Sequence, residues 1–483
     1  MQLSVKETRV GLLNSTTRIP FRYGKACLTR CPQAIVQVVI EADDKVQAGY
    51  SGDCLPPSWF DKSPDKDYAR QIDDMLAVIQ VAEAIYREEF ASAQVFFAGW
   101  RRAYQGVQEQ AAIRGMTPLL ASFGASLLER ATIDALCRMA GVSFATAVRS
   151  DLLGIQAGEI FAELSGLAPR DWLPDQPVKS IYVRHTVGLS DPLTAGDIPE
   201  SERLSDGFPQ ALEEYIEQCG LRYLKVKVSN QLTNDIDRLR HITEIVERHQ
   251  GDDYRLTLDG NEQYSSASDF DALIAAITSD DKLHTLWRNT LLIEQPLERS
   301  VAVDEAITGG IRELAATKPV IIDESDGALD SYQRAIELGY RGVSSKNCKG
   351  AMKSLLNAGL TWLKNYRGTR ADYVMTGEDL CSVGIVPVQA DMCLVATLGL
   401  SHIERNGHHY HPGLSYLPEQ QRAAALAKHS DLYANRNDII APRLVDGQFE
   451  IESLQCEGFG FAVEPDMDAM QSPEEWDFAS LGL

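Results

Sequence analysis

The stretch Arg255-Leu-Thr-Leu-Asp259, followed by Leu291-Leu-Ile-Glu294 and Pro319-Val-Ile-Ile-Asp323, sets the pattern of this chain. Each segment is a short apolar run that ends on a carboxylate and leads into turn-forming residues. Short β-rich runs bounded by such residues are typical of buried strands. The run Tyr223–Val228 comes before them with two lysines, and Gly342–Lys346 comes after them and ends on a third. The pattern therefore predicts strands whose carboxyl ends carry charged side chains.

Runs of this kind recur from about residue 180 onward and alternate with helical stretches. From Lys227 to Glu378 successive strand ends lie 23 to 35 residues apart, which suits one strand and one crossover helix. Eight such units predict an α/β fold, a (β/α)8 (TIM-like) barrel with its site at the carboxyl ends of the strands. An open doubly wound sheet is the alternative, which the count of eight and the lack of a Gly-rich phosphate loop disfavour. The predicted strands are Ile181–Thr186, Tyr223–Val228, Arg255–Asp259, Leu291–Glu294, Pro319–Asp323, Gly342–Lys346, Asp372–Thr376 and His402–Arg405.

The chain outside this region has a different character. Residues 1 to about 65 are predicted to form strands and loops, with a strand over 33–41 and a Gly- and Pro-rich loop over 49–59. The following residues, to about 150, show helical periodicity. The sequence thus predicts an N-terminal α+β part over 1–150, a barrel over 180–440 and a tail over 441–483 that returns to the N-terminal part.

Composition narrows the class of protein. The chain has 483 residues, 44% of them hydrophobic, and a formal net charge of −23. An acidic surface argues against nucleic acid and anionic membranes as partners. The N-terminus lacks the pattern of a signal peptide, and no apolar run approaches the roughly 18 residues of a membrane helix. Nine scattered cysteines indicate reduced thiols and a cytoplasmic location. The oligomeric state is left open, and a homo-oligomer is compatible with the sequence.

Three carboxylates at successive strand ends predict a metal site. Asp259, Glu294 and Asp323 become neighbours if their strands are adjacent in a barrel. Hard oxygen ligands with positions left for water suit Mg²⁺. Any one of these acids could instead cap the helix that follows it. Three caps in a row, each after an apolar run, are a weaker explanation than a shared cation.

Lysines on either side of the carboxylates predict proton transfer. Lys225 and Lys227 are two apart, so they share one face of their strand. We expect each to lower the pKa of the other, which favours a neutral base near pH 7. Lys346, two strands past Glu294, would reach the site from the opposite side and form a two-base pair with Lys227. The alternative is that all three are solvated surface lysines.

Five further residues are candidates for supporting the metal ligands or contacting a substrate. Glu378 ends the seventh strand and could equally be a helix cap, and Lys349 also fits an ordinary surface lysine. His408 belongs to a His-His-x-His cluster that could suggest a zinc hydrolase, although its spacing differs from the i, i+4 pair of helical zinc motifs. A polar loop after the eighth strand, near the substrate, explains the cluster better. The five are Asn261, Glu324, Lys349, Glu378 and His408.

Together these motifs resemble the enolase superfamily, in particular its mandelate racemase/muconate lactonizing enzyme family and the muconate-lactonizing-enzyme-like subgroup. The order and spacing match jointly and cover nearly the whole chain, although about 65–115 looks enlarged for the group. The motifs are Lys225-Val-Lys227, Asp259-Gly-Asn261, Glu294-Gln-Pro296, Asp323-Glu-Ser325 and Lys346 in a Lys-x-x-Lys setting. Outside the barrel, Arg18–Gly24 and Gly49–Gly52 resemble two capping loops, and Leu127–Asp134 and Gly458–Gly460 resemble segments that flank the barrel.

The resemblance implies a function and a set of roles. Residues 1–150 and the tail would cap the barrel, with specificity in loops around 17–31 and 49–65. Mg²⁺ would be held by Asp259, Glu294 and Asp323, Lys227 and Lys346 would be acid/base groups, and Lys225 would give electrostatic support. The implied reaction is Mg²⁺-dependent abstraction of the proton α to a carboxylate through an enediolate, ending in racemisation, epimerisation or cycloisomerisation of a small carboxylic acid. The alternatives are a dehydratase on the same site and a non-catalytic binding barrel.

The sequence also departs from the family pattern. The sixth-strand segment Ser344–Gly350 is more polar than usual and has one glycine where the family often has two. The seventh strand has no His-Asp dyad of the mandelate-racemase kind, and the eighth has Asn406-Gly-His-His409 instead of an Asp-x-Asp motif. These departures leave the substrate open.

Overall fold

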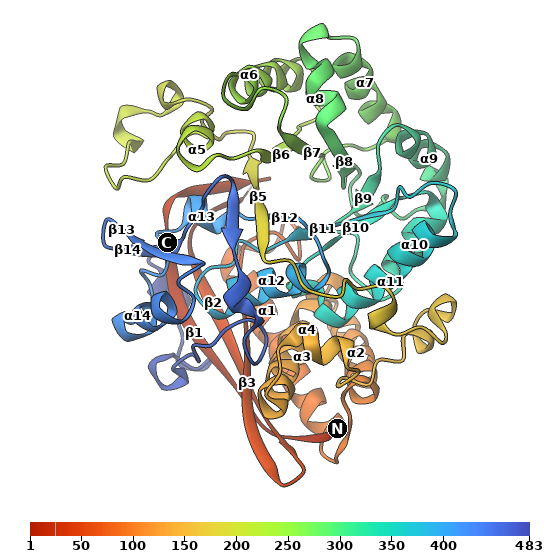
Figure 1. Ribbon diagram of the computed structural model, residues 1–483, viewed down its shortest axis with the longest axis vertical. Coiled ribbons are helices and arrows are strands. Elements are labelled where there is room, and N and C mark those ends of the chain that lie inside the picture. The colour runs from red at the N-terminus through yellow and green to blue at the C-terminus, as the bar shows by residue number, and fades with distance from the viewer. Residues whose placement is uncertain (25) are drawn as a thin grey trace.

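The computed structural model describes residues 1–24 and 26–483 and shows a closed barrel beside an N-terminal sheet with helices (Figure 1). Within this part of the chain, eight parallel strands form the barrel in the order β5 to β12, and β12 pairs with β5 to close it. The predicted barrel and its eight strands are therefore confirmed. The barrel strands are β5 Ser180–Val187, β6 Tyr223–Lys227, β7 Arg255–Asp259, β8 Thr290–Glu294, β9 Val320–Ile322, β10 Gly342–Ser345, β11 Val374–Glu378 and β12 His402–Glu404.

Helices follow the barrel strands and lie on the outside of the barrel (Figure 1). Most are amphipathic, as α6 shows, with Ile236, Leu239 and Ile242 buried on one face. The exception is α12, which is buried along its whole length. These helices are α5 Leu212–Cys219, α6 Leu232–Gln250, α7 Ala267–Thr278, α8 His284–Asn289, α9 Thr308–Thr317, α10 Ser331–Leu338, α11 Ala351–Arg367 and α12 Val386–Thr397. Two later helices lie elsewhere: α13 Gly407–Tyr410 contacts the N-terminal strand β1 (Gln2–Tyr23), and α14 Glu419–Lys428 contacts β13 (Tyr433–Arg436).

The N-terminal part is an antiparallel sheet packed against helices. Its strand order is β3-β2-β1-β4, and β1 and β2 form a long hairpin. Helix α3 is buried over 119–137 and contacts the sheet, α1, α2 and the segment after β10. The sheet strands are β1 Gln2–Tyr23, β2 Ala26–Ala42, β3 Lys45–Cys54 and β4 Gln94–Val95. The helices are α1 Tyr68–Glu89, α2 Phe96–Ile113, α3 Pro118–Ala140 and α4 Phe144–Arg149.

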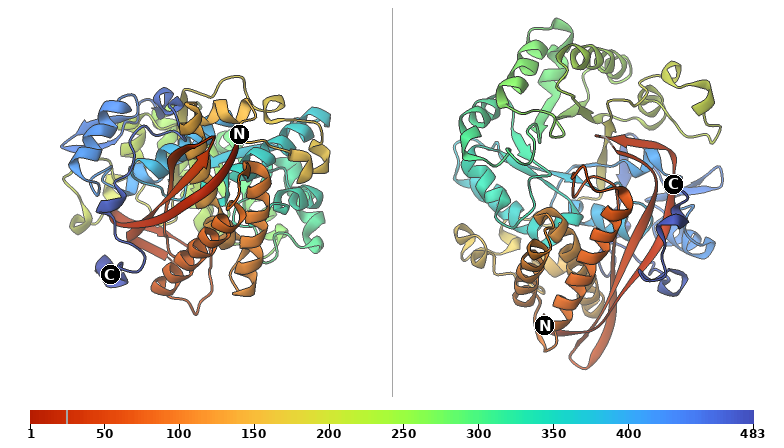
Figure 2. Two further views of the ribbon diagram at one scale, coloured as in Figure 1. Left: turned by 90° about the horizontal axis from the view of Figure 1, so that it is seen from below. Right: turned by 180° about the vertical axis from the view of Figure 1, so that it is seen from behind.

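The C-terminal segment contacts both parts of the molecule. Strand β15 (Gln448–Glu450) pairs antiparallel with β5 of the barrel, and β13 (Tyr433–Arg436) pairs with β14 (Ile439–Pro442). Further on, Gln471 pairs with Leu12 of β1. Figure 2 shows the C-terminal end beside the long N-terminal strands.

Two predicted loops are strands in the structure. Residues 49–54 belong to β3, and the described residues of 17–31 lie in the β1–β2 hairpin, apart from a turn at Gly24. Gly49 begins the predicted loop over 49–59, but its role is close packing, because a Cβ there would lie 2.1 Å from the backbone nitrogen of Ala135 in α3. Glycine content alone does not separate these two uses.

None of the helices in the described part of the chain is both long and apolar enough to cross a membrane.

Candidate active site

Strand register brings the charged side chains together at the carboxyl end of the barrel. Lys227, Asp259 and Glu294 are paired across β6, β7 and β8. Glu378 and Glu404 are paired across β11 and β12. Because alternate residues of a strand share a face, these side chains and those two positions earlier point into the same space. The predicted site residues from distant parts of the sequence therefore meet in one cluster.

Lys225 lies at the centre of this cluster. Its Nζ is 2.6 Å from Glu294, 2.8 Å from Glu404, 3.2 Å from Asp259 and 3.3 Å from Glu378. Burial alone would lower the pKa of Lys225, but the surrounding carboxylates outweigh it and raise that pKa well above its usual range. Lys225 is thus a fixed positive charge in the floor of the site.

The two predicted acid/base lysines end opposite strands of the barrel. Three strands separate β6, which carries Lys227, from β10, which leads into Lys346, whichever way one goes around. Lys227 Nζ contacts Asp259 Oδ2 at 2.7 Å. Lys346 Nζ contacts Asp323 at 2.9 Å and Glu378 at 3.0 Å, and it lies 4.9 Å from the centre of the Trp59 ring.

The predicted pKa of Lys227 needs correction. Burial and Lys225 lower it, as expected, but the adjacent Asp259 carboxylate reverses the effect, and the pKa is raised. The pKa of Lys346 is also raised, by Asp323 and Glu378 against the effect of burial. Without a metal, the carboxylates determine the direction of both pKa shifts, whereas the sequence-based expectation included only the effect of the neighbouring lysine.

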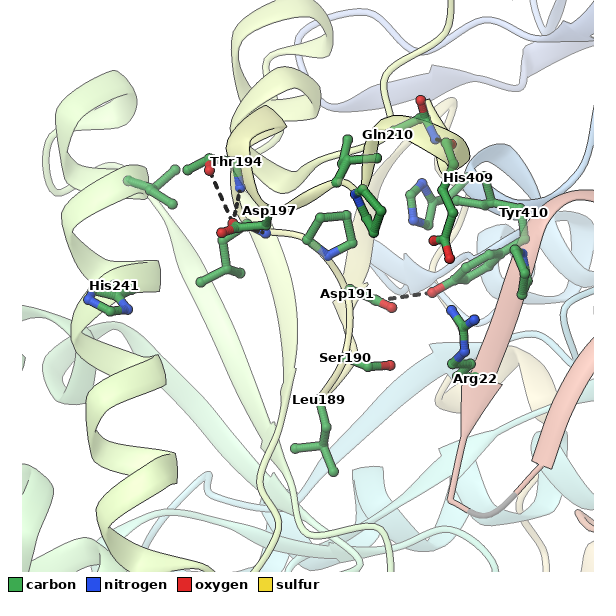
Figure 3. Close-up of a pocket in the computed structure, with 18 of the residues that line it drawn as sticks. Arg22, Leu189, Ser190, Asp191, Thr194, Asp197, Gln210, His241, His409 and Tyr410 are labelled. Carbon is green, nitrogen blue, oxygen red and sulfur yellow. Dashed lines mark hydrogen bonds between the residues drawn. The ribbon is translucent and has the colours of Figure 1, made fainter. Parts of the chain in front are cut away.

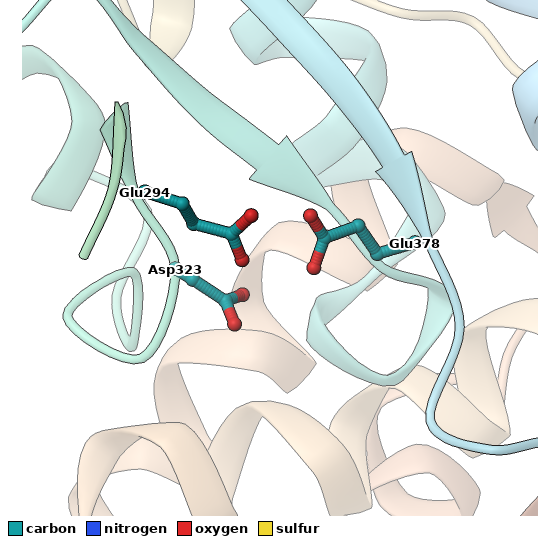
Figure 4. A group of neighbouring side chains, drawn as sticks. All are labelled: Glu294, Asp323 and Glu378. Carbon is teal, nitrogen blue, oxygen red and sulfur yellow. The ribbon is translucent and has the colours of Figure 1, made fainter. Parts of the chain in front are cut away.

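The carboxylate cluster fits a divalent cation. Glu294, Asp323 and Glu378 each present an oxygen, and these oxygens lie within 4.8 Å of one another (Figure 4). Glu294 Oε2 is buried without a hydrogen-bond partner. Burial and the nearby Glu378 raise the pKa of Glu294 well above its usual range. An unpaired buried carboxylate oxygen among other carboxylates is what a bound cation would compensate.

The third predicted ligand, Asp259, is turned toward the lysines. Its Oδ2 contacts Lys227 and Lys225, and its Oδ1 accepts the backbone N–H of Asn261 at 2.7 Å. Glu378, which we had expected beside the ligands or the substrate, joins Glu294 and Asp323 in the group of oxygens within 4.8 Å of one another. Glu378 is also held by Arg184 of β5 at 2.6 Å.

Three other candidate residues surround this cluster. Asn261 Nδ2 donates to Glu324 Oε1 at 3.1 Å, and burial together with Asp323 raises the pKa of Glu324 to about 7. Lys349 is not a surface lysine, because it is 1% exposed and its Nζ donates to both the backbone oxygen and Oδ1 of Asp323 at 2.8 Å. Lys349 thus orients Asp323.

His408 belongs to a different group of side chains. Its Nε2 is 3.0 Å from Nδ1 of His185, and the rings of Tyr215 and His409 pack around them. Burial lowers the pKa values of His185 and His408. Among the residues that the structure describes, the His/Cys/Asp/Glu groups close enough to share a metal do not include these histidines.

Two residues of the cluster, Glu404 and Arg184, were not predicted from the sequence. Glu404, in β12, accepts from Lys225 and from Thr186 Oγ1 at 2.6 Å, and Arg184 pairs with Glu378. Both are buried in the barrel interior. The available signal was strand alternation, since Glu404 lies two residues after His402 within the last predicted strand, as Glu378 lies two residues after Thr376, the end of the strand before it.

A small cavity lies over the cluster. Its volume is about 70 Å³, and its lining includes Lys225, Lys227, Asp323, Lys346 and Glu404. A larger cavity of about 760 Å³ lies between β1, the segment 189–204 and α6 (Figure 3). The charged cluster described above does not line this larger cavity.

Comparison with known proteins identifies the fold. No family model matches the sequence, and no curated protein matches it either. A mandelate racemase/muconate lactonizing protein from Herpetosiphon aurantiacus matches with a TM-score of 0.60 and 16% identity, covering 96% of this chain and 99% of that chain. A dipeptide epimerase from Enterococcus faecalis V583 matches at 0.57 and 14%, covering 95% and 99%. A muconate lactonizing enzyme from Pseudomonas fluorescens matches at 0.57 and 16%, covering 95% and 97%. The chain therefore has the fold of the mandelate racemase/muconate lactonizing enzymes of the enolase superfamily.

Proposed function

We propose that this protein is a Mg²⁺-dependent enzyme that removes the proton α to the carboxylate of a small carboxylic acid, as a racemase, an epimerase or a cycloisomerase. The observation that carries the proposal is the pair Lys227 and Lys346, on opposite barrel strands with a buried carboxylate cluster between them. The dipeptide epimerase of the same fold was crystallised with Mg and a dipeptide, and the lactonizing enzyme with muconolactone.

The metal ligands in this proposal are Asp259, Glu294 and Asp323. Glu378 is already compensated by Arg184 and Lys346, whose positive charges it contacts directly. Asp259 pairs with Glu294 across β7 and β8, so a cation at Glu294 would also be within reach of Asp259. When bound, Mg²⁺ would stabilise the second negative charge that develops on the substrate carboxylate.

The lysines carry out the proton transfers. One lysine, in its neutral form, takes the α-proton, and the C–H electron pair moves into the carboxylate to give the enediolate. The ammonium of the opposite lysine delivers a proton to the other face of the α-carbon, which inverts its configuration. In a cycloisomerisation, ring closure forms the same enediolate, and a lysine ammonium protonates its α-carbon. Lys225 remains charged and stabilises the enediolate.

Deuterium exchange tests the proposal. Small chiral carboxylates are incubated with enzyme, Mg²⁺ and D₂O, and incorporation at the α-carbon is followed by mass spectrometry. We expect exchange that EDTA abolishes, with Lys227→Ala and Lys346→Ala each losing exchange from one enantiomer. Lys282→Ala, at an exposed position outside the barrel, is the matched control. If acids bind but neither EDTA nor Lys227→Ala alters their exchange, the protein is a binding barrel rather than an enzyme.

A further inference from the structure

The small cavity over the charged cluster has two unlike walls. Its floor carries charged side chains from the barrel strands, and Asn261, Glu324 and Asn406 lie at its edge. Its roof comes from the β1–β2 hairpin, the segment 55–62 and the residues after β11. The roof residues are Phe21, Tyr23, Leu28, Pro56, Trp59, Leu380 and Cys381.

The Tyr23 hydroxyl and the Asp379 carboxylate, two polar groups close to the roof, already have partners. The Tyr23 hydroxyl donates to the backbone oxygen of Pro57 at 2.7 Å. Asp379 also lines the cavity, but its carboxylate is paired with the buried guanidinium of Arg405, which donates a further bond to Ser382. The cations among the described residues that line the cavity are Lys225, Lys227 and Lys346, all of them in the floor. A charged group of a ligand would thus find its partners at the floor and none at the roof.

Strand β1 separates this cavity from the larger one. Arg18 and Ile19 line the large cavity, and from Pro20 onward the residues alternate: Pro20 and Arg22 line the large cavity, whereas Phe21 and Tyr23 line the small one. Tyr410 stacks on Phe21 with ring centres 4.1 Å apart, and its hydroxyl donates to Asp191 at 3.0 Å (Figure 3). Arg22, on the other side of β1, therefore cannot contact a ligand that lies over the charged cluster.

We propose that the substrate is a monocarboxylate whose α-carbon carries one compact apolar group, either an aromatic ring or a branched alkyl group. This inference rests on the proposed function, which puts the substrate carboxylate at the floor. The rest of the molecule then meets aromatic and aliphatic side chains, where burial of apolar surface is favourable. A second carboxylate, an ammonium group or a chain of hydroxyls would lose its water at the roof without gaining a charged partner.

A matched series of 2-hydroxy acids tests the substrate class. Mandelate and 2-hydroxyisovalerate carry the apolar group, malate carries a second carboxylate, and gluconate carries several hydroxyls. Binding is measured by calorimetry with Mg²⁺, and α-proton exchange is measured in D₂O. We expect the two apolar acids to bind at least about tenfold more tightly than malate or gluconate, in the range that hydrophobic pockets reach.

Two roof variants and one control make the test specific to the pocket. Trp59→Ala should weaken mandelate binding about tenfold, since it removes the largest apolar side chain of the roof. Leu28→Lys should reduce the difference in affinity between mandelate and malate. If this variant folds poorly, Leu380→Lys repeats the test. Lys282→Ala should change none of these values.

The outcomes separate the two proposals. The substrate class is wrong if malate or gluconate binds more tightly than mandelate. It is also wrong if Trp59→Ala and the folded lysine variant both keep the wild-type ratio of mandelate to malate affinity. In either case α-proton exchange would still support the enzyme. Selective binding of mandelate without exchange of any acid would overturn the proposed function and leave the pocket assignment standing. If no acid binds, both are wrong.

Discussion

At the scale of single residues, the site is a balance of buried charges that no residue sets alone. Lys225 contacts four carboxylates, and Lys346 and Lys349 both contact Asp323. Removing one member of such a network leaves its partners buried and uncompensated, so effects of substitutions will not add. The same balance explains why Lys227 is a charged group in the metal-free protein although a lysine lies two residues away.

Carboxylate substitutions should show which residues hold the metal. Mg²⁺ at about 100 times its dissociation constant should stabilise the folded protein by roughly 2.7 kcal/mol, which raises the melting temperature by a few degrees. We expect Asp259→Asn, Glu294→Gln and Asp323→Asn to lose this shift, and Glu378→Gln to keep most of it. Differential scanning calorimetry with and without Mg²⁺ measures the effect. Loss of the shift in Glu378→Gln, with retention in Asp259→Asn, would instead identify Glu294, Asp323 and Glu378 as the ligands.

Glu129 in α3 should make stability depend on pH. It accepts hydrogen bonds from Trp100 at 2.6 Å and from the backbone of Met352 at 2.9 Å, but burial raises its pKa from 4.5 to about 7. At a pH between these two pKa values, the Glu129 carboxyl is ionised in the unfolded chain but keeps its proton in the folded protein. Glu129 therefore lowers the free energy of unfolding as pH rises, by at most about 3 kcal/mol from pH 4 to pH 8.

Urea denaturation at several pH values checks this effect. We expect the free energy of unfolding of Glu129→Gln minus that of the wild type to increase from pH 4.5 to pH 7, because only the wild type loses stability over this range. Glu88→Gln, at an exposed position of α1, should give a difference that does not depend on pH. A pH-independent difference for Glu129→Gln as well would show that Glu129 ionises normally in the folded protein.

At the scale of elements, the segment 55–62 is held over the site by a clamp from the barrel loops. Arg299, after β8, donates to the backbone oxygens of Trp59 and Phe60 at 3.2 and 3.4 Å. It also forms a bidentate pair with Glu262, after β7, at 2.6 and 2.9 Å, and Lys62 pairs with the same carboxylate. Through this clamp, two barrel loops fix Trp59 beside Lys346.

Loss of the clamp should make the segment 55–62 more mobile without affecting the barrel strands that carry the charged cluster. Arg299→Ala leaves Glu262 with Lys62 and the backbone N–H of residue 299 as partners. We expect the free energy of unfolding to fall by roughly 3 kcal/mol, as when one partner of a buried ion pair is removed. Amide exchange should become faster in residues 55–62 and stay unchanged in β6 to β8, as hydrogen–deuterium exchange mass spectrometry can show. Arg312→Ala, an exposed residue of α9, is the control. Equal exchange in 55–62 of variant and wild type would contradict the clamp.

At the scale of the whole molecule, the C-terminal segment joins the N-terminal sheet to the barrel. Strand β15 pairs with β5, whereas Asp468, Gln471 and Trp476 contact β1 through Arg9, Leu12 and Asn14. These contacts join residues more than 450 positions apart, as the pair Arg9–Asp468 shows. The sheet that forms the roof of the site thus depends on both ends of the chain.

Truncation after residue 465 tests this dependence. It removes the contacts to β1 and keeps β15, so we expect a lower melting temperature and faster amide exchange in β1 and β2. The Mg²⁺-dependent shift should persist, because every proposed ligand is in the barrel. Exchange that rises equally in the barrel strands would show that the segment supports the whole fold rather than the sheet.

Local chemistry in the sequence determined the barrel and most of the floor of the site. Apolar runs with charged ends at regular spacing are short-range patterns, and the carboxyl ends of parallel strands necessarily meet at one side of a barrel. Asp259, Glu294, Asp323 and the three lysines could therefore be assigned to one cluster before any contact was known. The residues that form the roof of the cavity could not be assigned in this way.

Tertiary structure alone decided the rest, because the contacts concerned are non-local. Glu404 and Thr186 are 218 positions apart and meet only when β12 closes against β5. Lys349 fits an ordinary surface lysine by its sequence but is buried against Asp323, and Gly49 lies in a predicted loop but packs against α3. The pKa of Lys227 depends on how close Asp259 comes relative to Lys225. Spacing along the chain carries no information about such distances, whereas the packed fold sets them.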